Sequence, residues 1–295
     1  MRKTRPQHRP PADMRWPMLA VSDGCTHGKC HFCDIYTGIP FEPFDMDEIV
    51  EQIDEIARTA TALTKRIYLT GGNPLALPTA RLIEVFDEVE KRIPTVKGYG
   101  GFCRIMDVAR KSDEELALLA SRGVNGLAIG AESGWDPVLA FMEKGQTAAD
   151  LVEQSTRLHE AGIEFTFFYL AGLAGTGRGQ ENALASAEVF SKCEPKTILV
   201  VTITPTKTWP LAADIAAGRW SPATEVEMAQ EIRTFIANLD CSTSIICSHD
   251  TDILRFDGVL PGNRQTMLDL MDNLIPKIDE QEARFLREMI HKATF

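Results

Sequence analysis

The sequence lacks any apolar run long enough to cross a bilayer. Its longest, near Ile198 to Ile203, is far shorter than the roughly 20 residues of a spanning helix. Basic charge is also scarce, with 31 Lys and Arg against 42 Asp and Glu and a net charge of −11. Because nucleic-acid-binding domains are usually basic, neither a nucleic acid nor a membrane is expected as a partner.

Repeats at solenoid periods, low-complexity tracts and a secretory signal are missing too. The basic N-terminus is not followed by an apolar segment, so cytoplasmic residence is expected. A hydrophobic content of 44% and a charged content of 25% are typical of a globular protein. We expect a basic arm over residues 1–16, which is either solvated or in contact with RNA or another anionic partner. A core is expected over 17–221 and a C-terminal helical cap over 222–295, both in one structural unit because no linker separates them.

After residue 17, short apolar runs alternate with longer amphipathic stretches. The runs predict strands over Met18–Ser22, Arg66–Thr70, Val96–Phe102, Gly126–Ala131, Glu164–Leu170 and Thr197–Ile203. Between them, helices are predicted near 46–60, 79–93, 112–122, 135–144, 147–161 and 179–191, and further helices near 222–239, 264–272 and 278–291.

Helix-capping residues at the starts of the predicted helices support an α/β fold. Asp45 or Asp47 can cap the first helix, and Ser112 with Glu115 forms a capping box. Six strands alternating with six helices imply a parallel sheet, closed as a barrel or open as a doubly wound sheet. In both architectures ligands bind at the C-terminal ends of the strands.

Of the seven cysteines, three lie within nine residues. Cys25, Cys30 and Cys33 form a C-x4-C-x2-C motif directly after the first predicted strand. Three thiolates on one loop can bind three irons of a [4Fe–4S] cluster and leave the fourth iron without a protein ligand. Reductive cleavage of a sulfonium needs such an open position.

Three other interpretations of this motif stay open. A plant-type [2Fe–2S] ferredoxin uses the same run but needs a fourth cysteine, and the next one here is Cys103. A zinc site with His27 or His31 would usually need a second ligand cluster. The cysteines could also be simple buried hydrophobes, although the loop is polar.

With this motif the chain resembles the radical SAM (S-adenosylmethionine) superfamily, and in particular a branch of short proteins with C-x4-C-x2-C and mostly unnamed activities. Typical members have C-x3-C-x2-C, so the spacing here departs by one residue. The resemblance continues through Gly24–His27, Ala131–Gly134, Lys144-Gly145 and Gly258–Pro261. It implies a partial (β/α)6 barrel with a helical C-terminal cap.

The resemblance also implies roles for individual residues. Phe32 is placed to pack near the SAM adenine, and Gly71-Gly72-Asn73 stands where relatives bind the SAM amino group. Asn73 replaces the usual acidic residue of that turn. Glu132 matches the acceptor of the ribose hydroxyls, or else is an acid at a helix N-terminus. The remaining cofactor candidates are Arg104, Ser133, Gly172, Gly175 and Thr204. For Arg104 the alternative is an ion pair at the surface.

Two residues are candidates for substrate contact, namely Cys103 at a strand end and His249, whose alternative is a loop histidine bonded to Asp250 or Asp252. Cys193 and Cys241 read as structural, and Trp209 and Trp220 as packing residues.

The predicted function is reductive cleavage of SAM to methionine and a 5′-deoxyadenosyl radical. That radical would abstract hydrogen from a small-molecule substrate, with the electron supplied by a flavodoxin- or ferredoxin-like donor. The sequence shows no cobalamin domain before the cysteines and no cysteine-rich C-terminal segment. Porphyrinogen decarboxylation is the alternative within the class, and a non-catalytic zinc protein is the alternative from another class.

Overall fold

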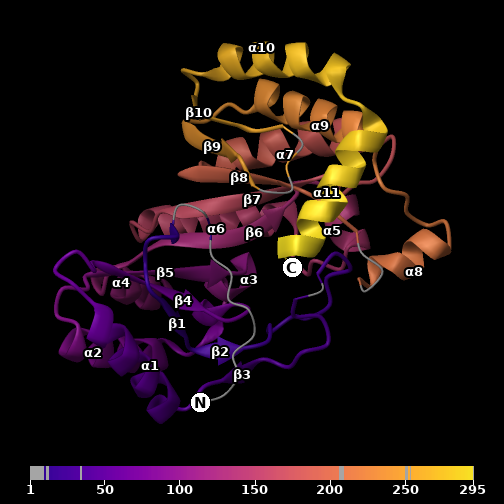
Figure 1. Ribbon diagram of the computed structural model, residues 1–295. Helices are drawn as coiled ribbons and strands as arrows, with labels where there is room; N and C mark the ends of the chain where they lie inside the picture. Colours follow the sequence, from indigo (N-terminus) through magenta and orange to yellow (C-terminus); the bar gives the residue numbers. More distant parts are fainter. Residues whose placement is uncertain are drawn as a thin grey trace. The chain divides into compact units, whose positions relative to one another are not determined.

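A computed structural model of the chain describes residues 10, 13–33, 35–205, 209–249, 252 and 254–294. The chain is an α/β protein (Figure 1) whose main sheet has the strand order β1-β4-β5-β6-β7-β8-β9-β10. Its strands are β1 Met18–Ala20, β4 Arg66–Thr70, β5 Gly98–Cys103, β6 Val124–Glu132, β7 Phe165–Ala171, β8 Thr197–Thr202, β9 Thr243–Cys247 and β10 Phe256–Leu260.

Helices occupy most of the chain between these strands. The longer ones are α1 Met46–Thr59, α2 Thr79–Arg92, α4 Asp113–Ser121, α6 Ala148–Glu160, α7 Gly179–Cys193, α9 Glu225–Asn238, α10 Arg264–Leu274 and α11 Glu280–Thr294. Shorter elements are β2 Ser22–Asp23, β3 Glu42–Pro43, η2 Pro74–Ala76, α3 Ile105–Val108, α5 Asp136–Phe141, α8 Leu211–Ala216 and η3 Ile275–Lys277.

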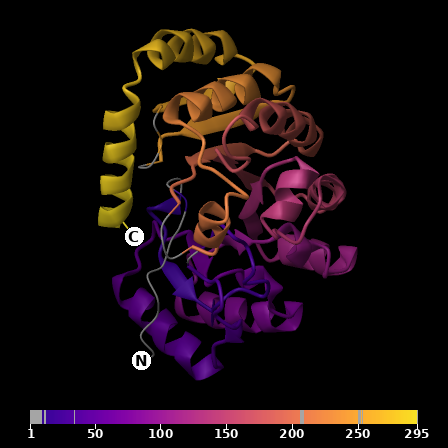
Figure 2. The same ribbon diagram turned by 90° about the vertical axis from the view of Figure 1, so that its right-hand side faces the viewer.

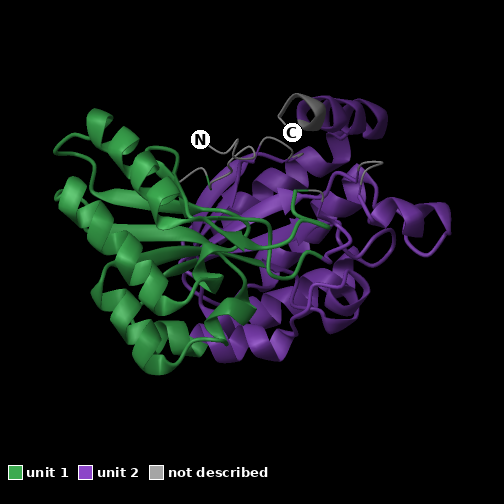
Figure 3. Ribbon diagram, turned by 90° about the horizontal axis from the view of Figure 1, so that it is seen from below, with its two compact units in different colours: residues 1–28, 35–130, 156–165 green, residues 29–34, 131–155, 166–295 purple. Residues whose placement is uncertain are grey.

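The chain divides into two compact units, coloured in Figure 3. Unit 1 comprises residues 1–28, 35–130 and 156–165, and unit 2 comprises residues 29–34, 131–155 and 166–295. Each unit is described below by itself.

In unit 1, β1 pairs parallel with β4, β4 with β5, and β5 with β6. Helices α1 and α2 pack side by side (Figure 1). The buried face of α2 consists of Leu82, Val85, Phe86 and Val89, whose spacing is that of one helical stripe. The buried strand residues and this stripe form the apolar core of the unit.

In unit 2, β7 pairs parallel with β8, and β8 with β9, whereas β10 is antiparallel to β9. Helices α7 and α9 pack against one another, and α10 packs on α9. Figure 2 shows α10 and α11 (both yellow) running in different directions from the short turn that joins them.

The predicted fold class is confirmed. All six predicted strands are present, as β1 and β4 to β8, and the pairs recorded among them are parallel. The capping box of α4 is also confirmed, because the Glu115 N–H donates to Ser112 Oγ at 3.2 Å and the Ser112 N–H to Glu115 Oε2 at 2.8 Å. The first helix is capped by Asp45, since α1 begins at Met46.

The C-terminal region is helical as predicted, but it also contains β9 and β10, which were not predicted. Both strands have only five residues, and the second contains Gly258, a residue with low strand propensity. Their strand conformation depends on pairing with β8 and with each other, which no local pattern reveals. Most of the expected basic arm lies outside the described residues. No helix in the described part of the chain is long and apolar enough to span a bilayer.

Candidate SAM and cluster site

The start of the cysteine loop is held by the turn after β4. The Gly72 N–H donates to Gly24 O at 3.0 Å, one residue before Cys25. A Cβ on Gly72 would lie 2.1 Å from Gly24 O, so only glycine permits this approach. The glycines of this turn were expected to let its backbone approach a ligand. They also let its backbone approach the cysteine loop.

Asn73 ties this loop to α3. Its Oδ1 accepts the Thr26 N–H at 3.0 Å, and its Nδ2 donates to Thr26 Oγ1 at 2.7 Å and to Asp107 Oδ2 at 2.9 Å. Asn73 is fully buried, and burial raises the pKa of Asp107. The acidic group missing from the Gly-Gly-Asn turn is thus supplied by Asp107, behind the asparagine.

Arg104 and Cys103 stand at the C-terminal end of β5, as expected. Arg104 is buried, which excludes the alternative of a surface ion pair, and its backbone N–H donates to Asp107 Oδ2 at 2.9 Å. Burial raises the pKa of Cys103 well above its ordinary value, with a smaller contribution from Asp107. Its thiol therefore stays protonated, as in structural rather than reactive cysteines.

The other two motif cysteines belong to unit 2. A tight turn joins them, in which the Cys33 N–H donates to Cys30 O at 3.2 Å. All three motif cysteines are partly exposed and form no disulfide. Three accessible thiols on one polar loop are the residue types that ligate a cluster. Among the described residues, no group of three or more His, Cys, Asp or Glu side chains is placed to hold a metal ion.

His31, between these two cysteines, is committed to other partners. Its Nδ1 lies 3.1 Å from Asp214 Oδ2 and its Nε2 lies 3.4 Å from Glu143 Oε1. Both ring nitrogens thus lie within ion-pair distance of a carboxylate, although Nδ1 makes no hydrogen bond within the described part of the chain.

Glu132 ends β6, and its backbone is strained. Its φ of +66° is unusual for a residue other than glycine. Its carboxylate pairs with the buried Lys144 at 2.9 Å, and the Lys144 ammonium lies 5.5 Å from the centre of the Phe32 ring. Helix α5 begins at Asp136, so Asp136 rather than Glu132 is the acid in its first turn. Strain of this kind is typical of functional positions.

Ser133 is fully buried beside Glu132. Its hydroxyl donates to Asn182 Oδ1 at 2.6 Å and accepts the Trp135 N–H at 2.9 Å. The hydroxyl therefore fixes the turn onto α7, which leaves the backbone of Ser133 for any contact with a cofactor.

The Gly172–Gly175 turn follows β7, as expected, and is held from α9. Gly172 has a φ of +85°, and its N–H donates to Glu231 Oε2 at 3.1 Å. Tyr169 Oη donates to the other oxygen of Glu231 at 2.7 Å. Burial raises the pKa of Glu231 to about 7, while these hydrogen bonds lower it.

Thr204 lies just beyond β8 and contacts the C-terminal helix. Arg287 Nη1 donates to Thr204 Oγ1 at 2.8 Å and to Ile203 O at 2.6 Å, and its guanidinium pairs with the fully buried Glu225. The orientation of the Thr204 hydroxyl is thus set from α11.

His249 is held through its backbone, whose N–H donates to Asp252 Oδ2 at 2.9 Å. The other oxygen of Asp252 accepts the Thr202 N–H at 3.0 Å, at the end of β8. Burial raises the pKa of Asp252 to about 7. Asp250, the other partner considered for His249, lies outside the described residues.

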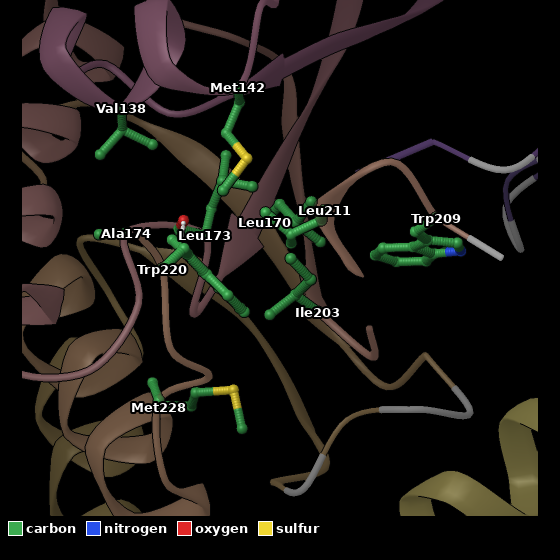
Figure 4. Close-up of a cluster of buried hydrophobic side chains, with 11 residues drawn as sticks. Val138, Met142, Leu170, Leu173, Ala174, Ile203, Trp209, Leu211, Trp220 and Met228 are labelled. Carbon is green, nitrogen blue, oxygen red and sulfur yellow. Dashed lines mark hydrogen bonds between the residues drawn. The ribbon is translucent and has the colours of Figure 1, made fainter. Parts of the chain in front are cut away.

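A cluster of buried apolar side chains lies within unit 2. Trp209 and Trp220 belong to a buried cluster with Met142, Ile203 and Leu211 (Figure 4), which confirms them as packing residues. An open pocket lies beside the Gly172–Gly175 turn, and its lining includes Trp220 and Phe141.

The sequence did not single out five side chains that hold the candidate residues, namely Asp107, Lys144, Asp214, Glu231 and Arg287. One signal was available, because Glu231 falls between Met228 and Ile232 on the buried face of α9. A charge on an apolar helical stripe indicates a buried partner. Lys144 belongs to the Lys144-Gly145 segment that carries the resemblance, but no pattern in the sequence indicates that it pairs with Glu132.

Comparison with known proteins gives consistent results. The model of the Radical SAM superfamily matches residues 19–178. The heme chaperone HemW of Bacillus subtilis (strain 168) is 26% identical over 190 residues, which cover 59% of this chain and 50% of HemW.

Solved structures share the fold at low identity. Methylornithine synthase (PylB) is similar with a TM-score of 0.56 and 19% identity over 86% of this chain and 68% of its own. Coproporphyrinogen III oxidase (HemN) from Escherichia coli is similar with a TM-score of 0.55 and 14% identity, over 75% and 52% of the two chains. The methyltransferase TsrM from Kitasatospora setae has a TM-score of 0.55 and 17% identity, over 69% and 39%. The chain thus spans about half of HemW and less of TsrM.

Proposed function

Because the chain belongs to the radical SAM superfamily, whose enzymes use a [4Fe–4S] cluster and S-adenosylmethionine, we propose that it cleaves SAM reductively and abstracts hydrogen from a small-molecule substrate. The observation that carries this proposal is the set of three partly exposed cysteines in the C-x4-C-x2-C loop, within the segment that matches the superfamily.

The chemistry that the bound cofactors supply is one-electron cleavage of the sulfonium to methionine and a 5′-deoxyadenosyl radical. Cys25, Cys30 and Cys33 would hold the cluster and leave one iron for SAM. Glu132 would accept hydrogen bonds from the ribose hydroxyls, Phe32 would pack near the adenine, and the backbone turns Gly71–Asn73 and Gly172–Gly175 would approach the remaining parts of SAM. Arg104, Ser133 and Thr204 complete the cofactor candidates.

The protein residues bind, orient and exclude water. A flavodoxin- or ferredoxin-like protein supplies the electron, and the enzyme acts in the cytoplasm. His249 is the side chain that we assign to substrate contact, since Asp252 fixes its backbone beside the end of β8.

The test is anaerobic reconstitution with iron and sulfide. We expect about four irons per chain, by analogy with three-cysteine cluster ligation, and formation of 5′-deoxyadenosine after reduction by dithionite. Replacing any one of Cys25, Cys30 and Cys33 by Ala should abolish the cluster, whereas Cys193→Ala, at a buried thiol outside the motif, should not. Stoichiometric zinc without iron, or no 5′-deoxyadenosine, would contradict the proposal. A 3-amino-3-carboxypropyl product would show that a different bond is cut.

A second candidate is a reaction on a tetrapyrrole, such as porphyrinogen decarboxylation. The similarity to HemW, a heme chaperone, favours it over other substrates within the class. Reconstituted protein would be incubated with SAM, reductant and coproporphyrinogen III. Release of CO₂ and faster formation of 5′-deoxyadenosine would support this candidate, and an unchanged rate would reject it.

A further inference from the structure

The turn between Cys30 and Cys33 is held at one residue, His31, by three separate attachments. The His31 N–H donates to Met142 O at 3.0 Å, just after α5. Its carbonyl accepts the Leu211 N–H at 3.0 Å, at the first residue of α8. Its imidazole lies between Asp214 and Glu143.

The two carboxylates that face the imidazole differ in environment. The Asp214 side chain is 7% exposed and its Oδ2 lies 3.1 Å from Nδ1, whereas the Glu143 side chain is 56% exposed and its Oε1 lies 3.4 Å from Nε2. Exposed ion pairs contribute little because water screens them. The buried Asp214 is therefore the stronger anchor.

Asp214 is itself fixed within α8. Its Oδ1 accepts from Arg219 Nε at 2.8 Å and from Arg219 Nη2 at 2.6 Å, which leaves Oδ2 for His31. Leu211, in the same helix, is fully buried in the apolar cluster of Figure 4, so the helix that carries Asp214 is anchored by packing.

We propose that Asp214 is a positioning residue that restricts the conformation of the Cys30–Cys33 turn before the cluster is inserted. The proposal rests on the function proposed above and adds to it a residue of α8, far along the chain from the cysteine motif. A turn that is already ordered loses less conformational entropy when it takes up the cluster.

The first measurement is amide hydrogen exchange in residues 29–34 of the cluster-free protein. In Asp214→Leu, which removes the carboxylate that faces the ring but keeps a side chain of similar size, we expect about tenfold faster exchange, equivalent to ~1.4 kcal/mol. Asp214→Asn removes the charge but keeps a polar side chain, and it should lie between Asp214→Leu and the wild type. Exchange in β8 and α9 should not change, which separates local opening from unfolding.

The second measurement is the rate at which a chelator removes iron from the reconstituted protein. It should rise several-fold in Asp214→Leu and less in Asp214→Asn. Glu143→Gln, at the exposed carboxylate, is the matched control and should change both rates less than twofold. If Asp214→Leu does not fold, His31→Phe keeps a ring against Phe141 but removes both nitrogens, and it should open the same turn.

The outcomes separate the two proposals. If the wild type assembles no cluster, the proposed function fails, and the exchange measurement still decides the role of Asp214. If the wild type assembles a cluster and Asp214→Leu matches it in both rates, Asp214 has no positioning role. Equal effects of Glu143→Gln and Asp214→Leu would likewise overturn the assignment to Asp214.

Discussion

Asn73 shows how one side chain takes a different role from the acidic residue that it replaces. In this protein its amide donates hydrogen bonds to Asp107 as well as accepting one from Thr26. An aspartate could accept from Thr26 but would face a second buried carboxylate. The substitution in the sequence motif is therefore explained by the group behind it.

This predicts that Asn73→Asp destabilises unit 1. Two buried carboxylates in contact should lower the free energy of unfolding by about 2–3 kcal/mol at pH 8, the scale of a lost charged hydrogen bond. The loss should be smaller at pH 5, because one shared proton removes the repulsion. Urea unfolding at both pH values measures the effect, and equal losses would contradict it.

Glu132 makes the sharpest prediction at the scale of one residue. A carboxylate that accepts from neutral hydroxyls contributes roughly 1.5–3 kcal/mol, so Glu132→Ala should weaken SAM binding by roughly one to two decades. Glu132→Gln should be milder, because its amide oxygen still accepts. Equilibrium binding of SAM to reconstituted protein is the measurement.

Asp136→Ala is the matched control for Glu132, because Asp136 is the acid that lies at the start of α5. It should bind SAM like the wild type, and both variants should assemble the cluster normally. Unchanged SAM affinity in Glu132→Ala would show that Glu132 does not contact the ribose.

At the scale of elements, the turn after β7 depends on a helix that comes much later in the chain. Helix α9 supplies Glu231, which accepts from Gly172 N–H, Tyr169 Oη and Asn182 Nδ2 at 2.7–3.1 Å. Burial raises its pKa to about 7 from an ordinary value of 4.5. The folded protein therefore holds this proton more tightly than the unfolded chain does.

The raised pKa of Glu231 determines whether the free energy of unfolding rises or falls with pH. The stability that the raised pKa contributes is complete below pH 4.5 and is lost as pH rises through about 7. Across that range the loss should be of the order of 3 kcal/mol, and Glu231→Gln should remove it. The free energy of unfolding between pH 5 and pH 8 is the measurement.

Two further variants complete this test. Asp252, whose pKa is also raised to about 7, titrates in the same window, so Asp252→Asn should remove a second part of the slope. Glu153→Gln, at an exposed residue of α6, should leave the slope unchanged. A Glu231→Gln slope equal to that of the wild type would contradict the argument.

At the scale of the whole molecule, the C-terminal helix α11 stabilises unit 2 through buried polar contacts. Arg287 reaches from α11 to the fully buried Glu225 and to the backbone just after β8. Removing one partner of a buried pair leaves an uncompensated charge, which costs about 3–5 kcal/mol. Arg287→Met should therefore destabilise the protein strongly in thermal or urea unfolding.

The same helix offers a matched control. Arg284 pairs with Glu280 one turn away, and its side chain is 48% exposed. Arg284→Met should cost less than about 0.5 kcal/mol, as exposed i,i+4 pairs do. Equal effects of the two substitutions would show that burial of the Arg287 pair does not matter.

The sequence by itself determined the alternation of strands and helices, the capping of α1 and α4, and the superfamily. These features are local, because hydrophobic period, caps and the spacing of cysteines are written in consecutive residues. The ends of the predicted strands also carried the candidate residues, since parallel strands present their C-terminal ends at one edge.

Only the tertiary structure decided which partners hold those residues. Asp107 behind Asn73, Lys144 beside Glu132, and Asp214 against His31 are pairings between elements distant along the chain. Likewise, β9 and β10 are short strands whose conformation depends on pairing with their neighbours. Such choices depend on burial and on contacts between distant segments, and one-dimensional patterns carry neither.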